Sequence, residues 1–136
     1  VLSKLLYGLQ TIWLSKSLRQ RIDAVHCYCL RQILGIPHSY ISRVTNAEVL
    51  RQANEVPLQF SLLRQQLLYY GRIKRNESHP AQHLLHEVPP KRRRGRPVLS
   101  WNEEVRKHIG RIKDNANCIY EPKQWCKVVT SYCFGD

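Results

Sequence analysis

Residues 57–74 read PLQFSLLRQQLLYYGRIK, which is the pattern of one long amphipathic helix. Proline suits the first turn of a helix, because its missing amide hydrogen is not needed there. We therefore expect the helix to begin at Pro57 and to reach about Lys74. Its apolar side chains recur at helical spacing and share one broad face, which predicts a core contact. They are Leu58, Leu62, Leu63, Tyr69, Tyr70 and Ile73.

The same helix carries basic residues and no acid on the side away from its leucines. These basic residues are Arg64, Arg72, Lys74 and Arg75. Simple amphipathicity explains the leucines, but it does not explain why every charge on the outer side is positive. We therefore expect either an ordinary solvated face or a second contact surface for the phosphates of a nucleic acid.

Another amphipathic helix precedes this one. Ser15 or Ser17 caps its start, and Gly35 ends it in a left-handed cap, with a proline two residues later that cannot continue a helix. The apolar stripe that we expect to face inward consists of Leu18, Ile22, Val25, Cys29 and Ile33. Cys27 and Arg31 lie off that stripe, so we expect them to point away from the core.

Shorter helices complete the pattern. Thr45 to Glu48 and Ser100 to Glu103 are capping boxes, in which a hydroxyl and a carboxylate satisfy the free amides of a first turn. The first opens a short helix to about Ala53, and the second opens a stripe of Trp101, Val105, Ile109 and Ile112. A short helix is expected over 78–86 and a final one after Glu121, with Trp125, Val129 and Tyr132 inward. Residues 38–44 and 114–120 are expected to be loops.

No alternation of period two occurs, so we predict an all-α fold of about five to seven helices in a small bundle. We divide the chain into a helical region at 1–86, a basic Pro/Arg-rich linker at 87–99 and C-terminal helices at 100–136. The chain has no methionine at its start or elsewhere. We therefore expect a piece of a longer polypeptide.

Charge is the strongest compositional signal. The 136 residues contain 22 Lys and Arg against 10 Asp and Glu, a formal net charge of +12. Such a balance favours an anionic partner. No apolar stretch is long enough to span a bilayer, no secretory signal is present, and no large exposed apolar face is expected beside the basic run. We expect an intracellular protein whose partner is nucleic acid and not a membrane.

The positive charge is densest in one short segment. It consists of Lys91, Arg92, Arg93, Arg94, Gly95, Arg96 and Pro97. Guanidinium groups stay charged and are costly to bury unpaired, so this segment is not part of a core. Its Arg-Gly-Arg-Pro end resembles the core of an AT-hook, in which glycine allows close backbone approach and arginines lie in a narrow minor groove. A solvated basic linker is the alternative.

The sequence offers no catalytic or metal site. Its five cysteines are irregularly spaced, and none forms a Cys-x-x-Cys pair or a zinc-finger set. His79, His83 and His86 share a helical face, but no nearby cysteine or carboxylate completes a site, which favours surface histidines. No nucleophile and base fall together, and no glycine-rich phosphate loop precedes a helix. We therefore expect no catalytic residue, no metal and no cofactor.

Taken in order, these features resemble the region downstream of the polymerase domain in non-LTR (LINE-type) retrotransposon reverse transcriptases. The resemblance covers roughly residues 1–106. It rests on Leu6-Tyr7-Gly8 with Trp13, Arg31 to Ile36, Arg43 to Leu50, Arg64 to Arg75 with Tyr70-Gly71, and Arg93 to Pro97 with Trp101.

The resemblance implies a thumb-like, non-catalytic segment that grips the backbone of template and primer, whether DNA, RNA or a hybrid. The polymerase domain is expected upstream in cis, and the location is expected to be nuclear. The paired aspartates that hold two metal ions for nucleotidyl transfer have no counterpart, because only Asp23, Asp114 and Asp136 occur. The alternative from the residues alone is an AT-hook-type chromatin protein.

Overall fold

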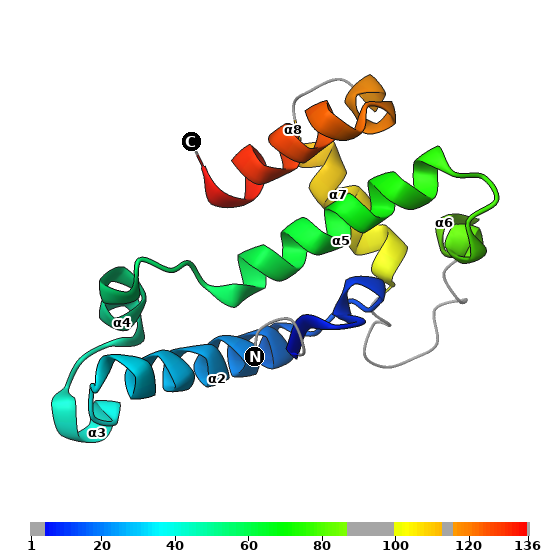
Figure 1. The fold of residues 1–136 in the computed structure, drawn as a ribbon. Coiled ribbons are helices and arrows are strands. Elements are labelled where there is room, and N and C mark those ends of the chain that lie inside the picture. The colour runs from blue at the N-terminus through cyan, green and yellow to red at the C-terminus, as the bar shows by residue number, and fades with distance from the viewer. Residues whose placement is uncertain (1–4, 87–99, 113–115, 136) are drawn as a thin grey trace. The chain divides into compact units, whose positions relative to one another are not determined.

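The structure is a computed structural model that describes residues 5–86, 100–112 and 116–135, with no side-chain account of 116 and 117. Every regular element in these ranges is helical, which confirms the all-α prediction (Figure 1). The α-helices are α2 (Lys16–Leu34), α3 (Ser39–Ser42), α4 (Asn46–Ala53), α5 (Leu58–Arg75), α6 (His83–His86), α7 (Trp101–Arg111) and α8 (Pro122–Phe134). The 3-10 helices are η1 (Leu9–Thr11), η2 (Pro80–Gln82) and η3 (Ala116–Tyr120).

The chain forms two compact units. One comprises residues 1–13 and 62–136, and we call it the α5–α8 unit; the other comprises residues 14–61, and we call it the α2–α4 unit. The C-terminal helices thus belong with most of α5. The division of the chain at a basic linker stays a prediction, because residues 87–99 lie outside the described residues.

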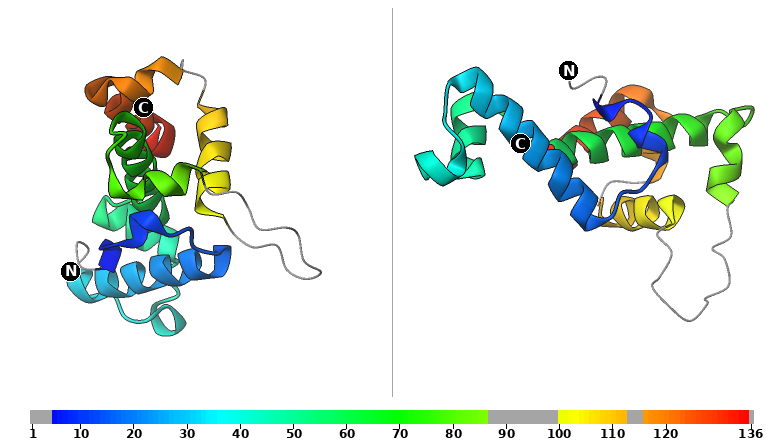
Figure 2. Two further views of the ribbon diagram at one scale, coloured as in Figure 1. Left: turned by 90° about the vertical axis from the view of Figure 1, so that its right-hand side faces the viewer. Right: turned by 90° about the horizontal axis from the view of Figure 1, so that it is seen from below.

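The α5–α8 unit has a continuous apolar core around α5. Its buried members are Leu63, Leu67, Tyr70, Ile73, Ala81, Leu85, Trp101, Val105, Ile119, Trp125, Val129 and Cys133. In Figures 1 and 2, α7 crosses α5 and α8 runs along it. The predicted inward residues Trp125 and Val129 of α8 are buried, and Tyr132 is half-buried, as the sequence indicated.

Trp125 fixes α8 on α5. Its indole N–H donates to the Leu67 carbonyl at 3.0 Å, and the side chain is 2% exposed. The ring lies directly on Gly71, where an added Cβ would be 2.6 Å from the indole Cδ1. Glycine is therefore required at this position by close approach, even though its backbone is helical.

The segment at residues 5–13 is held against α5 and α7 by side chains that reach its backbone carbonyls. The Gln66 amide donates to the Ile12 carbonyl at 2.7 Å, and the Trp101 indole donates to the Gln10 carbonyl at 2.9 Å. Figure 2 shows this segment beside both helices. Two contacts from different helices therefore fix the path of a segment that is mostly irregular.

In the α2–α4 unit, local sequence signals place the helix ends. The Ser15 hydroxyl caps α2, and Gly35 ends it with a φ of 67°, as predicted. Thr45 caps α4 by accepting from the Glu48 amide at 3.2 Å. Only that half of the predicted capping box forms, because the Glu48 carboxylate accepts from other side chains. Within the regions predicted as loops, 39–42 and 116–120 instead form the short helices α3 and η3.

The prediction of the inward face of α2 is wrong. Its apolar stripe is exposed at Leu18, Val25 and Ile33 and half-buried at Ile22 and Cys29. The buried residues of α2 are instead His26, Cys27 and Arg31. Helix α4 packs against α2, with its Val49 fully buried, so the covered side of α2 is the one that carries polar groups. Burial, with a further contribution from Asp23, raises the pKa of the Cys27 thiol.

Arg31 explains why that side is covered. Arg31 is 5% exposed, and its guanidinium donates to the carbonyls of Pro37, at 3.2 Å, and Val44, at 2.6 Å. It also donates to the Asn46 side chain at 3.2 Å. One side chain of α2 therefore gathers the connection through α3 and the start of α4. The outward orientation expected for it is corrected by these contacts.

Candidate nucleic-acid interface

The densest basic segment, residues 91–97, lies outside the described residues. The chain on either side of it is described. The Asn102 amide and the Arg106 guanidinium each donate to the Leu85 carbonyl at 2.9 Å. The end of α6 and the start of α7 are thus joined by two hydrogen bonds that converge on one oxygen. The described parts of the chain on either side of residues 87–99 are therefore held together on the α5–α8 unit.

The start of α7 differs from the prediction. Ser100 precedes the helix without a side-chain hydrogen bond to its first turn, so the predicted capping box does not form. The first turn carries Glu103 and Glu104, and the positive end of the helix dipole favours acidic residues there. Glu104 also pairs with Lys107. This helix end is therefore already supplied with negative charge, which weakens the expectation that it favours a phosphate.

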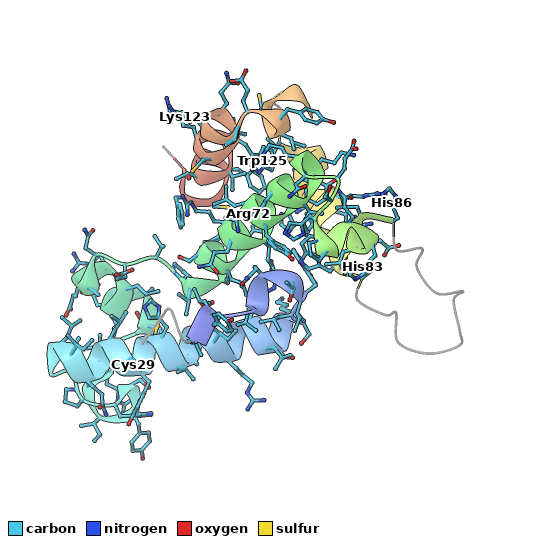
Figure 3. All side chains as sticks on the ribbon, turned by 45° about the vertical axis from the view of Figure 1, so that its right-hand side comes forward. Cys29, Arg72, His83, His86, Lys123 and Trp125 are labelled. Carbon is cyan, nitrogen blue, oxygen red and sulfur yellow. The ribbon has the colours of Figure 1, made fainter. Side chains whose placement is uncertain are left out.

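The four basic residues of α5 divide into two pairs. Arg72 and Lys74 are exposed. Arg64 and Arg75 are half-buried and bonded within the unit, which corrects their placement on an open outer face. Arg64 donates to the Thr130 hydroxyl of α8 at 3.0 Å, and Arg75 donates to the Ile119 carbonyl of η3 at 2.6 Å. Figure 3 labels Arg72 on α5 and Trp125 on α8.

The physical reason is that α5 is covered on more than one side. Helix α8 packs beside Arg64, and η3 packs beside Arg75, on a side that the apolar pattern leaves open. Near Arg64 lies Cys133, whose burial raises the pKa of its thiol to about 11, while the arginine acts in the opposite direction. The polar contacts of Arg64 and Arg75 therefore hold helices together, and Arg72 and Lys74 remain as the accessible cations of this helix.

The histidines and cysteines do not converge. His79 accepts from the Ala81 amide at 3.1 Å, and His83 contacts the Pro80 carbonyl at 3.0 Å. Each ring therefore contacts backbone atoms close to it in the sequence. His83 and His86 both belong to α6 (Figure 3). Among the described residues, no group of three or more potential metal ligands comes together. In the same ranges, no helix combines the length and apolarity that crossing a membrane requires.

A pocket of about 430 Å³ opens on the α5–α8 unit, where sequence reasoning predicted none. Its polar and aromatic lining consists of Tyr7, Gln10, Gln65, Tyr69 and Arg72. Of these, the sequence singled out Arg72 as a binding residue. The spacing of Gln65 and Arg72 places both on one face of α5, and the sequence could have indicated from this that they line one site. The sequence could not have indicated that residues 7 and 10 approach this face, because their position depends on hydrogen bonds to distant parts of the chain.

Comparison with known proteins adds no family assignment: no protein-family model, curated protein or solved structure matches this chain.

Proposed function

We propose that this chain is a non-catalytic nucleic-acid-binding segment of a retroelement reverse transcriptase, which grips the backbone of template and primer. The observation that carries the proposal is the basic segment, in which residues 91–96 supply five positive charges to a chain of net charge +12. Phosphate contacts by such cations release counterions and dominate affinity without reading sequence. The order of motifs that resembles LINE-type reverse transcriptases supplies the polymerase context.

Two features of the fold support this role. The hydrogen bonds of Asn102 and Arg106 to Leu85 hold together the described parts of the chain on either side of residues 87–99. Arg72 and Lys74 add accessible cations on α5. In this role the chain binds a duplex or hybrid in the nucleus, and a polymerase domain upstream in the same polypeptide carries out the chemistry.

The proposal is tested by the salt dependence of binding to an RNA–DNA hybrid and to duplex DNA, measured by fluorescence anisotropy with the 136-residue chain. We expect log K to fall steeply with log salt. Replacing Lys91, Arg92, Arg93, Arg94 and Arg96 by Gln should make the slope shallower by about 4 to 5, since each phosphate contact contributes about 0.9 on B-DNA.

A matched control replaces exposed cations of the α2–α4 unit, Lys16 and Arg21, and should change the slope by less. Affinity that is unchanged between low and moderate salt would contradict the proposal. So would a slope that the five substitutions leave intact, because the segment that carries the proposal would then make no phosphate contacts.

The second candidate is an AT-hook-type chromatin protein, which the order Arg94, Gly95, Arg96, Pro97 favours. It predicts tighter binding to A·T tracts than to G·C duplex, because arginines are attracted to a narrow minor groove. Arg94→Ala and Arg96→Ala should each remove that preference. Equal affinity of the unchanged chain for both duplexes eliminates this candidate and leaves the backbone-binding role.

A further inference from the structure

The pocket on the α5–α8 unit has the composition of a site for a planar, anionic ligand. Tyr7 projects into solvent at its edge and is 87% exposed. Gln10 and Gln65 bring side-chain amides that can both donate and accept, and Arg72 brings a guanidinium. None of the described lining residues is acidic. Leu6 and Leu68 supply an apolar floor.

Part of the pocket wall is fixed by contacts within the unit. The segment at residues 5–13, which carries Tyr7 and Gln10, is fixed by the Trp101 indole, which donates to the Gln10 carbonyl at 2.9 Å. The Tyr69 ring stands edge-on to the Trp101 ring, with centroids 6.1 Å apart, and edge-on to His79 at 5.8 Å. A wall held in this way loses little conformational freedom on binding, which favours affinity.

The size of the pocket suits a small planar ligand. Its volume of about 430 Å³ lies at the small end of the roughly 300–1,000 Å³ range of ligand sites. One nucleotide can be accommodated in a space of this size. An exposed aromatic ring beside amide groups and an arginine is the combination by which proteins hold unpaired bases: the ring stacks on the base, the amides meet its edge, and the cation meets the phosphate.

We propose that this pocket receives one unpaired nucleobase at the end of a duplex or hybrid, stacked on Tyr7 with its phosphate at Arg72. This inference rests on the proposed function and deepens it, because it names the form of nucleic acid that the α5–α8 unit prefers: a duplex with an unpaired nucleotide at its end. Backbone gripping by the basic segment and base capture by the pocket then act on the same molecule.

The test compares three DNA duplexes of one sequence: blunt, with one overhanging 2-aminopurine nucleotide, and with one overhanging abasic nucleotide. Stacking on an aromatic side chain is worth enough that the overhang should improve affinity about fivefold or more over the blunt and abasic duplexes. The fluorescence of 2-aminopurine should fall on binding, because stacking quenches it. This signal reports the base directly and does not depend on overall affinity.

Four variants locate the effect. Tyr7→Ala and Arg72→Gln should each abolish the preference for the overhang, whereas Tyr7→Phe, which keeps the ring, should retain it. Tyr120→Ala removes another exposed tyrosine of the same unit, which does not line the pocket, and should leave the preference unchanged. All side chains changed are exposed, and helix content by circular dichroism checks that each variant folds.

The outcomes separate the two proposals. Salt-dependent binding to all three duplexes with equal affinity, or a preference that survives Tyr7→Ala, overturns the pocket and leaves the proposed function standing. Absence of binding to any duplex at low salt overturns both. A preference that is lost in Tyr7→Ala and Arg72→Gln but kept in Tyr7→Phe and Tyr120→Ala supports the base pocket.

Discussion

The two units of this chain are stabilised in different ways. In the α5–α8 unit, α5 is packed by tryptophans from two other helices, and Trp101 and Trp125 are both buried. In the α2–α4 unit, the side of α2 that is covered carries His26, Cys27 and Arg31, and an arginine holds the connection to α4 through backbone carbonyls. One unit depends on buried apolar area, and the other depends heavily on directed hydrogen bonds.

This difference determines how each unit responds to substitution. Apolar burial is spread over many contacts, so a single large-to-small change leaves a cavity that neighbours fill only in part. A polar clamp concentrates its effect in one side chain, so losing it frees several backbone groups at once. The predictions that follow perturb one unit at a time, so that the other acts as an internal control.

The largest effect is expected at Trp125. Trp125→Ala removes the side chain that seals α8 on α5 and should lower the free energy of unfolding of the α5–α8 unit by about 3–5 kcal/mol. The measurement is urea unfolding followed by circular dichroism. Tyr120→Ala, at an exposed ring of the same unit, is the control and should change stability by no more than about 0.5 kcal/mol.

A second substitution disrupts the contact between Trp125 and Gly71 from the side of α5. Gly71→Ala places a Cβ 2.6 Å from the indole Cδ1 of Trp125, so α8 or the ring must shift. Because both changes disrupt one contact, the double variant should be less destabilised than the sum of the two single effects. Additive effects would show that Gly71 and Trp125 do not stabilise the unit through each other.

A smaller and more local effect is expected at Arg31. Arg31→Leu leaves the Pro37 and Val44 carbonyls without their donor. Losing hydrogen bonds to a charged group should cost about 1.5–3 kcal/mol in the free energy of local opening. Hydrogen exchange should then accelerate in residues 37–46, and amides of α5 and α8 within the α5–α8 unit should keep their protection.

Arg21→Leu is the matched control, because it removes an exposed arginine of the same helix. It should leave the exchange rates of residues 37–46 unchanged. Equal acceleration in both units after Arg31→Leu would mean that the clamp stabilises the whole chain, and the contrast between the two units would not hold.

The sequence predicted what local chemistry determines. The Ser15 and Thr45 caps, the Gly35 stop and the extents of α2 and α5 follow from residues within one or two turns of each other. The apolar pattern also identified Trp125 and Val129 as inward. Such features are readable because hydroxyl caps and left-handed glycines act on the backbone beside them.

What the sequence could not supply is which side of a helix its neighbours cover. The stripe at Leu18, Val25 and Ile33 is regular, but α4 packs against the side that carries Arg31. Similarly, Arg64 and Arg75 were placed outward because they lie off the leucine face, but Arg64 bonds to α8 and Arg75 bonds to η3. A periodic pattern identifies a face, and only the tertiary arrangement determines whether a polar face is buried with partners.

The candidate site was predictable to a similar degree. The basic composition of residues 91–97 and of α5 can be read directly, and Arg72 lies in the pocket. Tyr7 and Gln10 could not be assigned to that pocket, because hydrogen bonds from Gln66 and Trp101, more than fifty positions away, bring their segment to α5. Sequence reasoning therefore found the charges and missed the aromatic and amide groups beside them.

The smallest effect is expected at Glu48, which lies in the first turn of α4. Hydrogen bonds from Arg51 and then Gln52 lower the pKa of Glu48 to about 2. Its unfolded value is about 4.3, so the carboxylate stabilises α4 above that pH, and this contribution is lost as the pH falls toward 2. A carbon-detected NMR titration should give a midpoint near 2 for Glu48.

Arg51→Gln removes the main cause of the lowered pKa and should move the Glu48 midpoint upward, toward its ordinary range. Arg43→Gln, at an exposed arginine just before the helix, is the control and should leave the midpoint in place. A midpoint of about 4.3 in the unchanged chain would show that the carboxylate does not hold these partners in solution. The helix start would then depend on the Thr45 cap, and the α2–α4 unit would have fewer directed polar contacts than the structure shows.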